Sequence, residues 1–374
     1  MKEHMQDPIQ FNPENERIKR KYFEYLKEAG QKSQATIDGV AKSILRHETV
    51  TKFVDFGRFR KDDAIALKDY LGALKNGKGE FLSKSTIFAA TRDVKEFFKW
   101  LAYQAGYRSR INLLDLEYFN ISEKDIRMAK SKAFKEFPTL EQIRKVLSLM
   151  PGETDIQKRN RALVAFTILS GMRDRAIVSL KLKHVNLNKE VIDQDPREVV
   201  TKASKAIVTY FFPVGDDIKQ IVLDWVNYLQ KEKLYHLSAP LFPRTKMILD
   251  ENNNFTAAGI EPEHWSGANQ VREIFKTAFH RAGLTYYNPH SFRNTIVNLG
   301  ERICQNPEQF KAWSQNLGHE QVLTTFTNYG SIDVFRQGEV IRNMTLSPEN
   351  KPATLNDIKN LMKEIALQNR REEV

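Results

Sequence analysis

Residues 190–213, EVIDQDPREVVTKASKAIVTYFFP, mark the place where the pattern of the chain changes from helical to extended. A short apolar pair at 191–192 is followed by two further runs, 199–201 and 207–212, with a turn at Ala203 between them. Short runs rich in β-branched and aromatic residues on either side of a turn predict antiparallel strands. Because most of the chain on both sides has helical periodicity, the sequence predicts a mainly α fold with one small antiparallel β-sheet.

The part of the chain before this stretch has apolar residues at helical spacing from about residue 16 onward. We expect a flexible N-terminus at residues 1–15 and a compact helical domain at residues 16–110. Cations on its polar surface, mixed with few acids, are candidates to lie along nucleic-acid phosphates: Arg58, Arg60, Lys61, Lys84, Arg92, Lys95 and Lys99. The alternative for each of them is a solvated helix face.

A change of pattern separates this helical domain from a second one. Residues 111–137 are rich in charge and weak in periodicity, and they include Lys132, so they are interpreted as a basic linker that also contacts the phosphates. The second domain is expected at residues 138–346, because Thr139 and Gln142 form a capping-box pattern before an apolar run. A helix through residues 163–169 should end at Gly171, and helices should follow Pro240 apart from a loop at 252–267.

Composition limits the partners and the compartment. The 374 residues suit two domains, and a net charge of +11 suits a protein that binds a polyanion, although a merely basic surface would give the same sum. Cys304 is the only cysteine, so the chain can form neither an internal disulfide nor a four-cysteine zinc site, and a reducing cytoplasm is expected. No apolar run is long enough to predict a membrane span.

Four short segments after residue 170 carry side chains suited to phosphodiester chemistry. They are Gly-Met-Arg at 171–173, Thr-Lys-Ala-Ser-Lys at 201–205, Pro-His-Ser-Phe-Arg at 289–293, and the stretch from Leu-Gly-His at 317–319 to Tyr329. Two arginines, Arg173 and Arg293, can hold a phosphate with forked donors. Pro289 suits a helix start, which would place His290 on the same helical face as Arg293.

The remaining side chains could supply a nucleophile and an acid. The hydroxyl of Tyr329 has an ordinary pKa of about 10 and would need a cationic pocket or a base, for which His290 and His319 are available. Lys202 could protonate the leaving 5′ oxygen, and Lys205 on the same turn is the alternative donor or a contact to DNA. The competing interpretations are a structural ion pair for either arginine, a core position for Tyr329 and, for His319, packing at a tight helix junction beside Leu317 and Gly318.

The ordered set of Arg, Lys, His-x-x-Arg, Leu-Gly-His and Tyr resembles the catalytic signature of the tyrosine recombinases, or phage-type integrases, and the resemblance covers nearly the whole chain. It implies a core DNA-binding domain followed by an α+β catalytic domain that cuts and rejoins specific DNA sites through a 3′-phosphotyrosine. The implied catalytic residues are Arg173, Lys202, His290, Arg293, His319 and Tyr329. No metal or nucleotide cofactor is implied.

The resemblance also implies a homotetramer on double-stranded DNA, with a monomer or dimer when free and a cytoplasmic, nucleoid-associated location. Residues 347–374 would form a tail helix that docks on a neighbouring subunit or, equally, on its own chain. Two departures from the family pattern stand out. Ala176 occupies a position where the family usually has an acid, so that Asp174 or another group must support Arg173. His319 and Tyr329 are ten positions apart, one more than expected.

Two other functions are compatible with the same residues. A type IB-like topoisomerase shares the tyrosine and arginine chemistry but relaxes supercoils without two specific sites, so a relaxation assay on plasmid without a recognition site separates it. A catalytically silent architectural protein or repressor would bind DNA without forming a covalent adduct. All six expected side chains are present in this sequence, which favours the enzyme.

Overall fold

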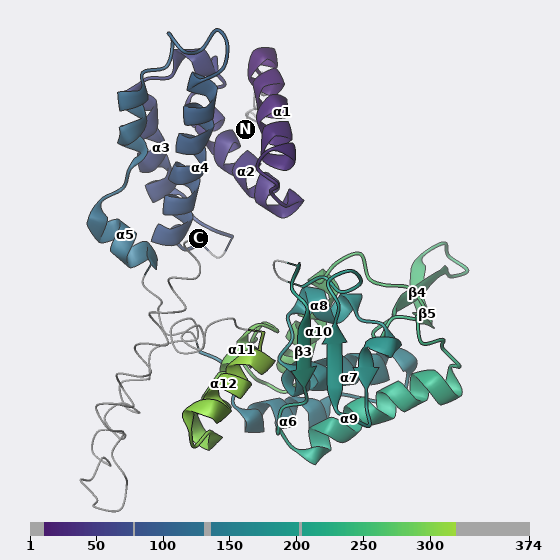
Figure 1. The fold of residues 1–374 in the computed structure, drawn as a ribbon. Helices are drawn as coiled ribbons and strands as arrows, with labels where there is room; N and C mark the ends of the chain where they lie inside the picture. Colours follow the sequence, from purple (N-terminus) through teal and green to yellow (C-terminus); the bar gives the residue numbers. More distant parts are fainter. Residues whose placement is uncertain (1–10, 78, 131–135, 202–203, 319–374) are drawn as a thin grey trace, which may run out of the picture. The chain divides into compact units, whose positions relative to one another are not determined.

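The computed structural model describes residues 11–77, 79–130, 136–201 and 204–318 (Figure 1). By its contacts the chain divides into two compact units, Met1–Lys132 and Ala133–Val374. Each unit has its own hydrophobic core, and each is described separately below. Within the described residues, no helix is both long and apolar enough to cross a membrane.

In its described residues, the first unit consists of helices and one isolated antiparallel bridge between Lys75 and Phe81. Its elements are α1 (Pro13–Glu28), α2 (Gln34–Val50), the 3₁₀ turn η1 (Phe56–Arg58), α3 (Lys61–Ala73), α4 (Lys84–Ala102), the 3₁₀ segment η2 (Leu113–Phe119) and α5 (Glu123–Lys130). Helix α4 is the central element, because it packs against α2, α3, η2 and α5. Its buried residues, among them Val94, Phe97, Phe98 and Leu101, recur at helical spacing, which is why this segment folds as an amphipathic helix.

Two predicted boundaries of the helical domain are wrong. Residues 13–15 were expected in a flexible N-terminus, but Asn12 caps α1 and the side chain of Asn15 is buried, where it accepts a hydrogen bond from the Phe56 amide and donates one to the Val54 carbonyl. Residues 111–130 were expected in a linker. Instead, Leu116 and Phe119 belong to the first core, because a few large apolar side chains at irregular spacing are enough to dock η2 on α3 and α4.

The second unit combines helices with two small sheets. Its elements are α6 (Leu140–Leu149), α7 (Asp155–Ser170), α8 (Asp174–Ser179), the 3₁₀ turn η3 (Leu182–His184), β1 (Val185–Asn186), β2 (Val191–Gln194), β3 (Ile207–Tyr210), α9 (Asp216–Asn227), the π-helical turn η5 (Tyr228–Glu232), β4 (Arg244–Leu249), β5 (Phe255–Glu261), α10 (Asn269–Arg281), α11 (Ser291–Ile303) and α12 (Pro307–Asn316). Helix α7 is apolar on nearly all sides and packs on α6, α9, α10 and α11 at the centre of the core. The predicted mainly α fold with a small antiparallel sheet is confirmed.

The predicted helix signals of this unit are confirmed. Thr139 and Gln142 form a reciprocal capping box at the start of α6, with hydrogen bonds of 3.2 and 2.9 Å between each side chain and the other residue's amide. Helix α7 ends at Gly171, which has the left-handed conformation (φ +60°) that glycine adopts without steric cost.

The predicted strands need two corrections. The first sheet has the order β1-β2-β3 and is antiparallel, but residues 199–201 are not a strand, because β3 pairs directly with β2 and residues 195–201 and 204–206 lie outside the ladder. The second is a hairpin of β4 and β5, where helix and loop were expected. Its apolar residues, including Met247 and Phe255, face solvent, so no burial period marks them as strands.

Candidate active site

The first predicted arginine follows a crowded glycine. Arg173 is half-buried and lies at the N-cap of α8, two residues after Gly171. A Cβ atom on Gly171 would lie 2.9 Å from the Ile296 Cδ1 atom and 2.9 Å from the Leu317 Cδ2 atom. The backbone before Arg173 is therefore in close contact with α11 and with the residue that follows α12.

The second predicted arginine ties these three segments together. Arg293 lies in the first turn of α11 and is 2% exposed. Its Nη1 atom donates to the carbonyl oxygen of Gly171, and its Nη2 atom donates to the Leu317 carbonyl at 2.6 Å. One buried guanidinium group thus connects the segment that leads to Arg173 with the segment that leads to His319.

The predicted pair of His290 and Arg293 has helical spacing. His290 has a helical backbone conformation and directly precedes α11, and the Arg293 amide donates to the His290 carbonyl at 3.1 Å. The Asn288 side chain accepts from the Ser291 amide at 3.2 Å and so caps this turn. The Pro289 ring is buried whereas His290 is exposed, so the imidazole lies at the surface above a fixed turn.

The end of α12 is docked on the edge of the first sheet, a contact that the sequence did not reveal. The Asn316 side chain accepts from the Tyr210 amide at 2.6 Å and donates to the Tyr210 carbonyl at 2.9 Å, so it pairs with strand β3 as a neighbouring strand would. Gly318 follows with φ +70°, and a Cβ atom there would lie 2.8 Å from the Ile207 side chain. The Leu-Gly-His segment is thereby fixed against β3 up to Gly318.

Several predicted residues lie outside the described part of the chain: Lys202, His319, Tyr329, Lys132 and the tail at 347–374. Lys205 is described, is half-buried and lies two residues before β3. The structure therefore brings together the segments of Arg173, Arg293 and Leu317, with His290 on the adjoining turn.

Ala176, at the position where an acid was expected from the family pattern, is apolar and has apolar surroundings. Ala176 is buried in the core of the second unit. Asp174 forms an ion pair with Arg272 at 3.0 Å, and its other carboxylate oxygen accepts from the Arg175 amide at 2.8 Å. Both oxygens of Asp174 thus have partners other than the Arg173 guanidinium group.

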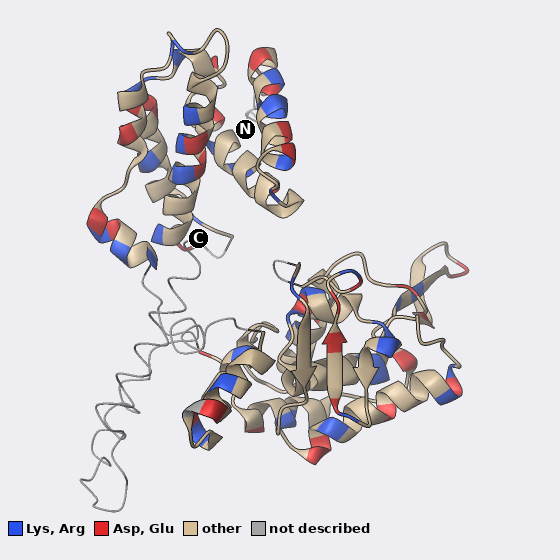
Figure 2. Ribbon diagram, viewed as in Figure 1, with Lys and Arg blue, Asp and Glu red and all other residues tan. Residues whose placement is uncertain are grey.

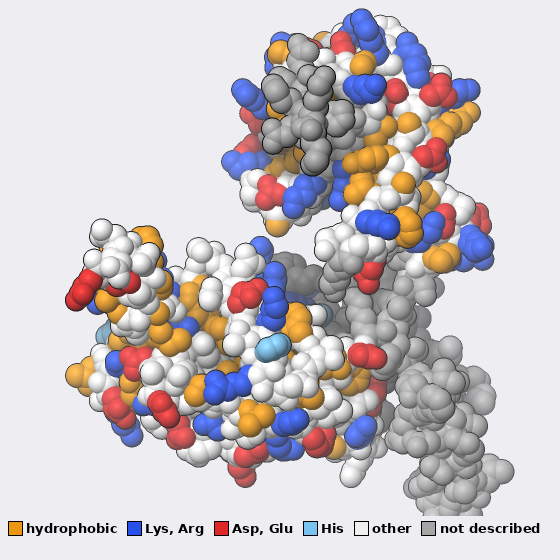
Figure 3. Space-filling model, turned by 180° about the vertical axis from the view of Figure 1, so that it is seen from behind, with side chains coloured by type: hydrophobic (Ala, Val, Ile, Leu, Met, Phe, Trp, Pro, Cys, Tyr) orange, Lys and Arg blue, Asp and Glu red, His pale blue; other side chains and the backbone are white. Residues whose placement is uncertain are grey.

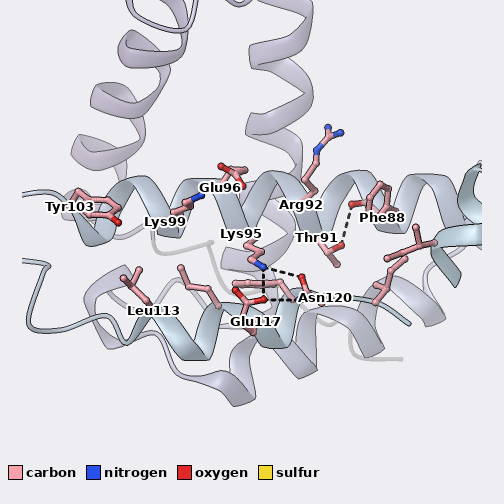
Figure 4. A pocket seen from close by; sticks show the side chains of 14 residues that line it. Phe88, Thr91, Arg92, Lys95, Glu96, Lys99, Tyr103, Leu113, Glu117 and Asn120 are labelled. Carbon is pink, nitrogen blue, oxygen red and sulfur yellow. Dashed lines mark hydrogen bonds and ion pairs between the residues drawn. The ribbon is translucent and has the colours of Figure 1, made fainter. Parts of the chain in front are cut away.

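The predicted basic surface of the first unit divides into paired and unpaired cations. Lys95 donates to Glu117 at 2.9 Å and to Asn120 at 3.0 Å across the groove between α4 and η2, and Arg92 points away from that groove (Figure 4). Lys84 pairs with Asp125 and Arg92 with Asp93. Figure 2 shows both charge signs along α4.

The other predicted cations have no acidic partner among the described residues: Arg58, Arg60, Lys61 and Lys99. Lys61 lies over the Tyr118 ring, with its Nζ atom 5.7 Å from the centroid, and Arg60 donates to the Phe59 carbonyl. On the face drawn in Figure 3, basic side chains lie among acidic ones on both units. A continuous basic patch is not visible there, so the unpaired cations are the better candidates for phosphate contacts.

In its fold, the chain is similar to solved structures of an integrase and of a site-specific recombinase. A lambda integrase dimer bound to a COC′ core site aligns with a TM-score of 0.56 over 87% of this chain and 85% of the integrase, at 14% identity. The XerH site-specific recombinase bound to difH substrate aligns with a TM-score of 0.53 over 86% of this chain and 84% of XerH, at 16% identity.

The sequence itself matches the model of the phage integrase family over residues 136–334, more than half of the chain. The chain belongs to the phage integrase family. The tyrosine recombinase XerC of Lactobacillus delbrueckii subsp. bulgaricus is 22% identical over 308 residues, which are 82% of this chain and 92% of that protein. XerC of Halalkalibacterium halodurans is 24% identical over 198 residues, and this match spans 52% of this chain and 58% of that protein.

Proposed function

We propose that this protein is a site-specific DNA recombinase that cleaves and rejoins strands through a 3′-phosphotyrosine intermediate. The observation that carries the proposal is the buried Arg293 guanidinium group, which joins the carbonyls of Gly171 and Leu317. Three segments of the family signature, distant in sequence, are gathered by this one side chain. The two carbonyls belong to the segments that lead, in sequence, to Arg173 and to His319.

In the proposed reaction, the Tyr329 oxygen attacks the scissile phosphorus and the bond from phosphorus to the 5′ oxygen breaks. The phenol proton passes to a base, for which His290 and His319 are the candidates, and Lys202 or Lys205 gives a proton to the departing oxygen. Arg173 and Arg293 offset the charge on the non-bridging oxygens. A 5′ hydroxyl of a partner duplex then reverses the step, and because an ester replaces an ester, no nucleotide is consumed.

The proposed substrate is double-stranded DNA with specific sites, on which the protein assembles as a homotetramer in the cytoplasm. The aligned lambda integrase is a dimer bound to a core site, and the aligned XerH recombinase is bound to its difH substrate, which supports a DNA-bound assembly. In the first unit, the cations without acidic partners, Arg58, Arg60, Lys61 and Lys99, are the proposed contacts to the phosphates.

Covalent trapping tests the proposal. A nicked suicide substrate that carries the recombination site releases its 5′ fragment after cleavage, so the wild-type protein should accumulate as a DNA adduct stable to denaturation. Tyr329→Phe should form none, whereas Tyr286→Phe, at an exposed tyrosine of the same unit, should form as much as wild type. Absence of an adduct with wild type on every candidate site would overturn the proposal, and adducts with relaxation of site-free plasmid would favour a topoisomerase.

A further inference from the structure

We infer that Glu198 is a positioning residue for the proton-donating lysine: it clamps the connection between β2 and β3, which carries Lys202 and Lys205, onto the segment that follows Arg173. The inference rests on the proposed function. It concerns a carboxylate that lies outside every motif of the family signature.

The clamp is a carboxylate with three cationic or polar partners. The Glu198 carboxylate lies 2.7 Å from the Lys183 Nζ atom, 3.3 Å from the Lys181 Nζ atom and 3.0 Å from the His184 Nε2 atom. The other imidazole nitrogen, Nδ1, accepts the Lys181 amide at 3.0 Å, so in the neutral ring the proton is on Nε2 and is donated to Glu198. The His184 ring is buried, which leaves it little freedom to turn away.

The partners of Glu198 lie on a fixed platform. Around them, the Leu182 amide donates to the Ala239 carbonyl at 3.0 Å, and the Lys183 amide donates to the Leu237 carbonyl at 2.9 Å. The Leu241 amide donates to the Leu180 carbonyl at 2.9 Å. Because this platform continues directly from α8, whose N-cap is Arg173, it is part of the framework that holds the first arginine.

The residues after Glu198 are also docked. The Val199 side chain is buried in the core, and the Val200 amide donates to the Ser179 hydroxyl oxygen at 2.9 Å. Lys202 is two residues beyond Val200 in the sequence. Anchoring at 198–200 therefore fixes the described backbone that leads into the lysine-bearing connection.

To hold its cationic partners, the Glu198 carboxylate must be ionised at the pH at which the protein acts. Hydrogen bonds from Lys183, His184 and Lys181 hold the pKa of the Glu198 carboxyl at about 2, so the carboxylate is ionised throughout the neutral range. Its side chain is about one third exposed, and single exposed ion pairs hold side chains weakly. Three partners from one short segment, together with the docked Val199 and Val200, provide the restraint that one pair would not.

The chemistry of the leaving group gives a readout specific to proton donation. When sulfur replaces the bridging 5′ oxygen of the scissile phosphate, the bond from phosphorus to sulfur breaks and a thiolate departs. A thiol has a pKa near 8.5, far below that of an alcohol, so the thiolate leaves without needing a proton. A defect in the proton donor, or in its positioning, should therefore disappear on the sulfur substrate, whereas a defect in folding, DNA binding or phosphate stabilisation should not.

The experiment compares single-turnover cleavage by the full-length protein on the oxygen and sulfur substrates. Glu198→Gln should slow cleavage of the oxygen substrate by about 10²-fold, as for a misplaced catalytic group, and leave cleavage of the sulfur substrate near the wild-type rate. Lys202→Ala or Lys205→Ala should show the same pattern, and the one that does is the donor. Glu190→Gln is the matched control, because Glu190 forms an ion pair with Lys219 at 2.8 Å on the same unit; it should leave both rates unchanged.

Several results would overturn the inference. Normal cleavage of the oxygen substrate by Glu198→Gln would do so, as would an equal loss on both substrates, which indicates a structural role. If the sulfur substrate restores cleavage by Glu198→Gln but by neither lysine variant, Glu198 acts through another group and the inference fails. Failure of wild type to form an adduct on either substrate would instead overturn the proposed function, and the inference with it.

Discussion

The buried guanidinium group of Arg293 has an architectural as well as a chemical task. Its Nη1 and Nη2 atoms donate to backbone carbonyls, so it fixes the positions of chain segments regardless of which side chains they carry. The planar guanidinium group of arginine can donate to two separate acceptors at once, whereas the ammonium group of lysine is a compact point charge. This difference makes the conservative change at Arg293 informative.

Arg293→Lys should lower both stability and cleavage. Leaving one of the two buried carbonyls without its donor should cost about 1–3 kcal/mol of unfolding free energy. Loss of a charged donor at the phosphate should slow cleavage by about 10²-fold or more. Thermal unfolding and single-turnover cleavage measure the two effects, and Arg302→Lys, at an exposed position of the same helix, is the control that should change neither. Equal unfolding temperatures for the two variants would contradict the architectural role.

His47 is a second buried basic group, in the core of the first unit. Neither of its ring nitrogens has a hydrogen-bond partner among the described residues, and the ring lies 4.9 Å from Phe98 and 6.3 Å from Phe56, measured between centroids. Burial lowers the pKa of its imidazole to about 3. The unfolded chain therefore takes up a proton below its ordinary pKa of 6.5, whereas the folded protein does so only near pH 3.

The first unit should consequently lose stability in mild acid. Because the unfolded state binds the extra proton between pH 6.5 and pH 3, the His47 contribution falls as the pH falls through this window, by about 2 kcal/mol at pH 5 relative to pH 7.5. His47→Leu removes the titrating group, so the difference in unfolding temperature between wild type and variant should change with pH. Calorimetry of the full chain at both pH values measures it, and a difference that does not depend on pH would disprove the assignment.

At the scale of elements, the junction between α7 and α8 is a tightly packed point of the candidate site. Gly171 combines a left-handed backbone with contacts to Ile296 and Leu317 that leave no room for a methyl group. Gly171→Ala should cost about 1–3 kcal/mol of unfolding free energy and displace Arg173, which reduces cleavage. Gly267→Ala serves as the control, because a Cβ atom there meets nothing within 4 Å. Chemical denaturation and adduct formation report the two effects; a harmless Gly171→Ala would refute the packing argument.

The elements also show what the sequence could predict. The helices around Val94 and Ile143 were predictable, because each buries one face and thereby records its period in the sequence. The helix around Leu163 was predictable from an apolar run that ends at Gly171. The β4–β5 hairpin was not, because its strands are defined by pairing with each other and not by burial. The 3₁₀ segment η2 was missed for a related reason, since its docking depends on two buried side chains, Leu116 and Phe119.

The candidate site was predictable as a set of residue types but not as an arrangement. The signature residues could be selected because arginine, lysine, histidine and tyrosine at these positions match a known order. The carbonyl partners of Arg293, the Asn316 contacts with β3 and the Glu198 clamp are contacts over long sequence separations. No local pattern encodes them, because they depend on the fold that brings the partners together.

At the scale of the whole molecule, the distribution of charge predicts how the protein holds DNA. Cations already paired with a carboxylate release fewer counterions on binding than unpaired ones, and each phosphate neutralised contributes about 0.9 to the slope of log affinity against log salt on duplex DNA. The double variant Arg58→Ala, Lys61→Ala should therefore reduce that slope by about 1.8. The matched double variant Lys84→Ala, Arg92→Ala removes two paired cations and should reduce it much less. Titrations of the full chain at several salt concentrations measure both, and equal slopes for the two variants would contradict the proposed DNA-binding surface.

The two hydrogen bonds of Arg293 also have a consequence for the order in which the arrangement around it can form during synthesis. Its partners lie 122 residues earlier and 24 residues later in the chain. During synthesis, the guanidinium group is made before the Leu317 carbonyl exists, so its second partner is missing until translation has passed that residue. A nascent chain, or a fragment that stops short of Leu317, therefore lacks one of the two carbonyl partners of this guanidinium group.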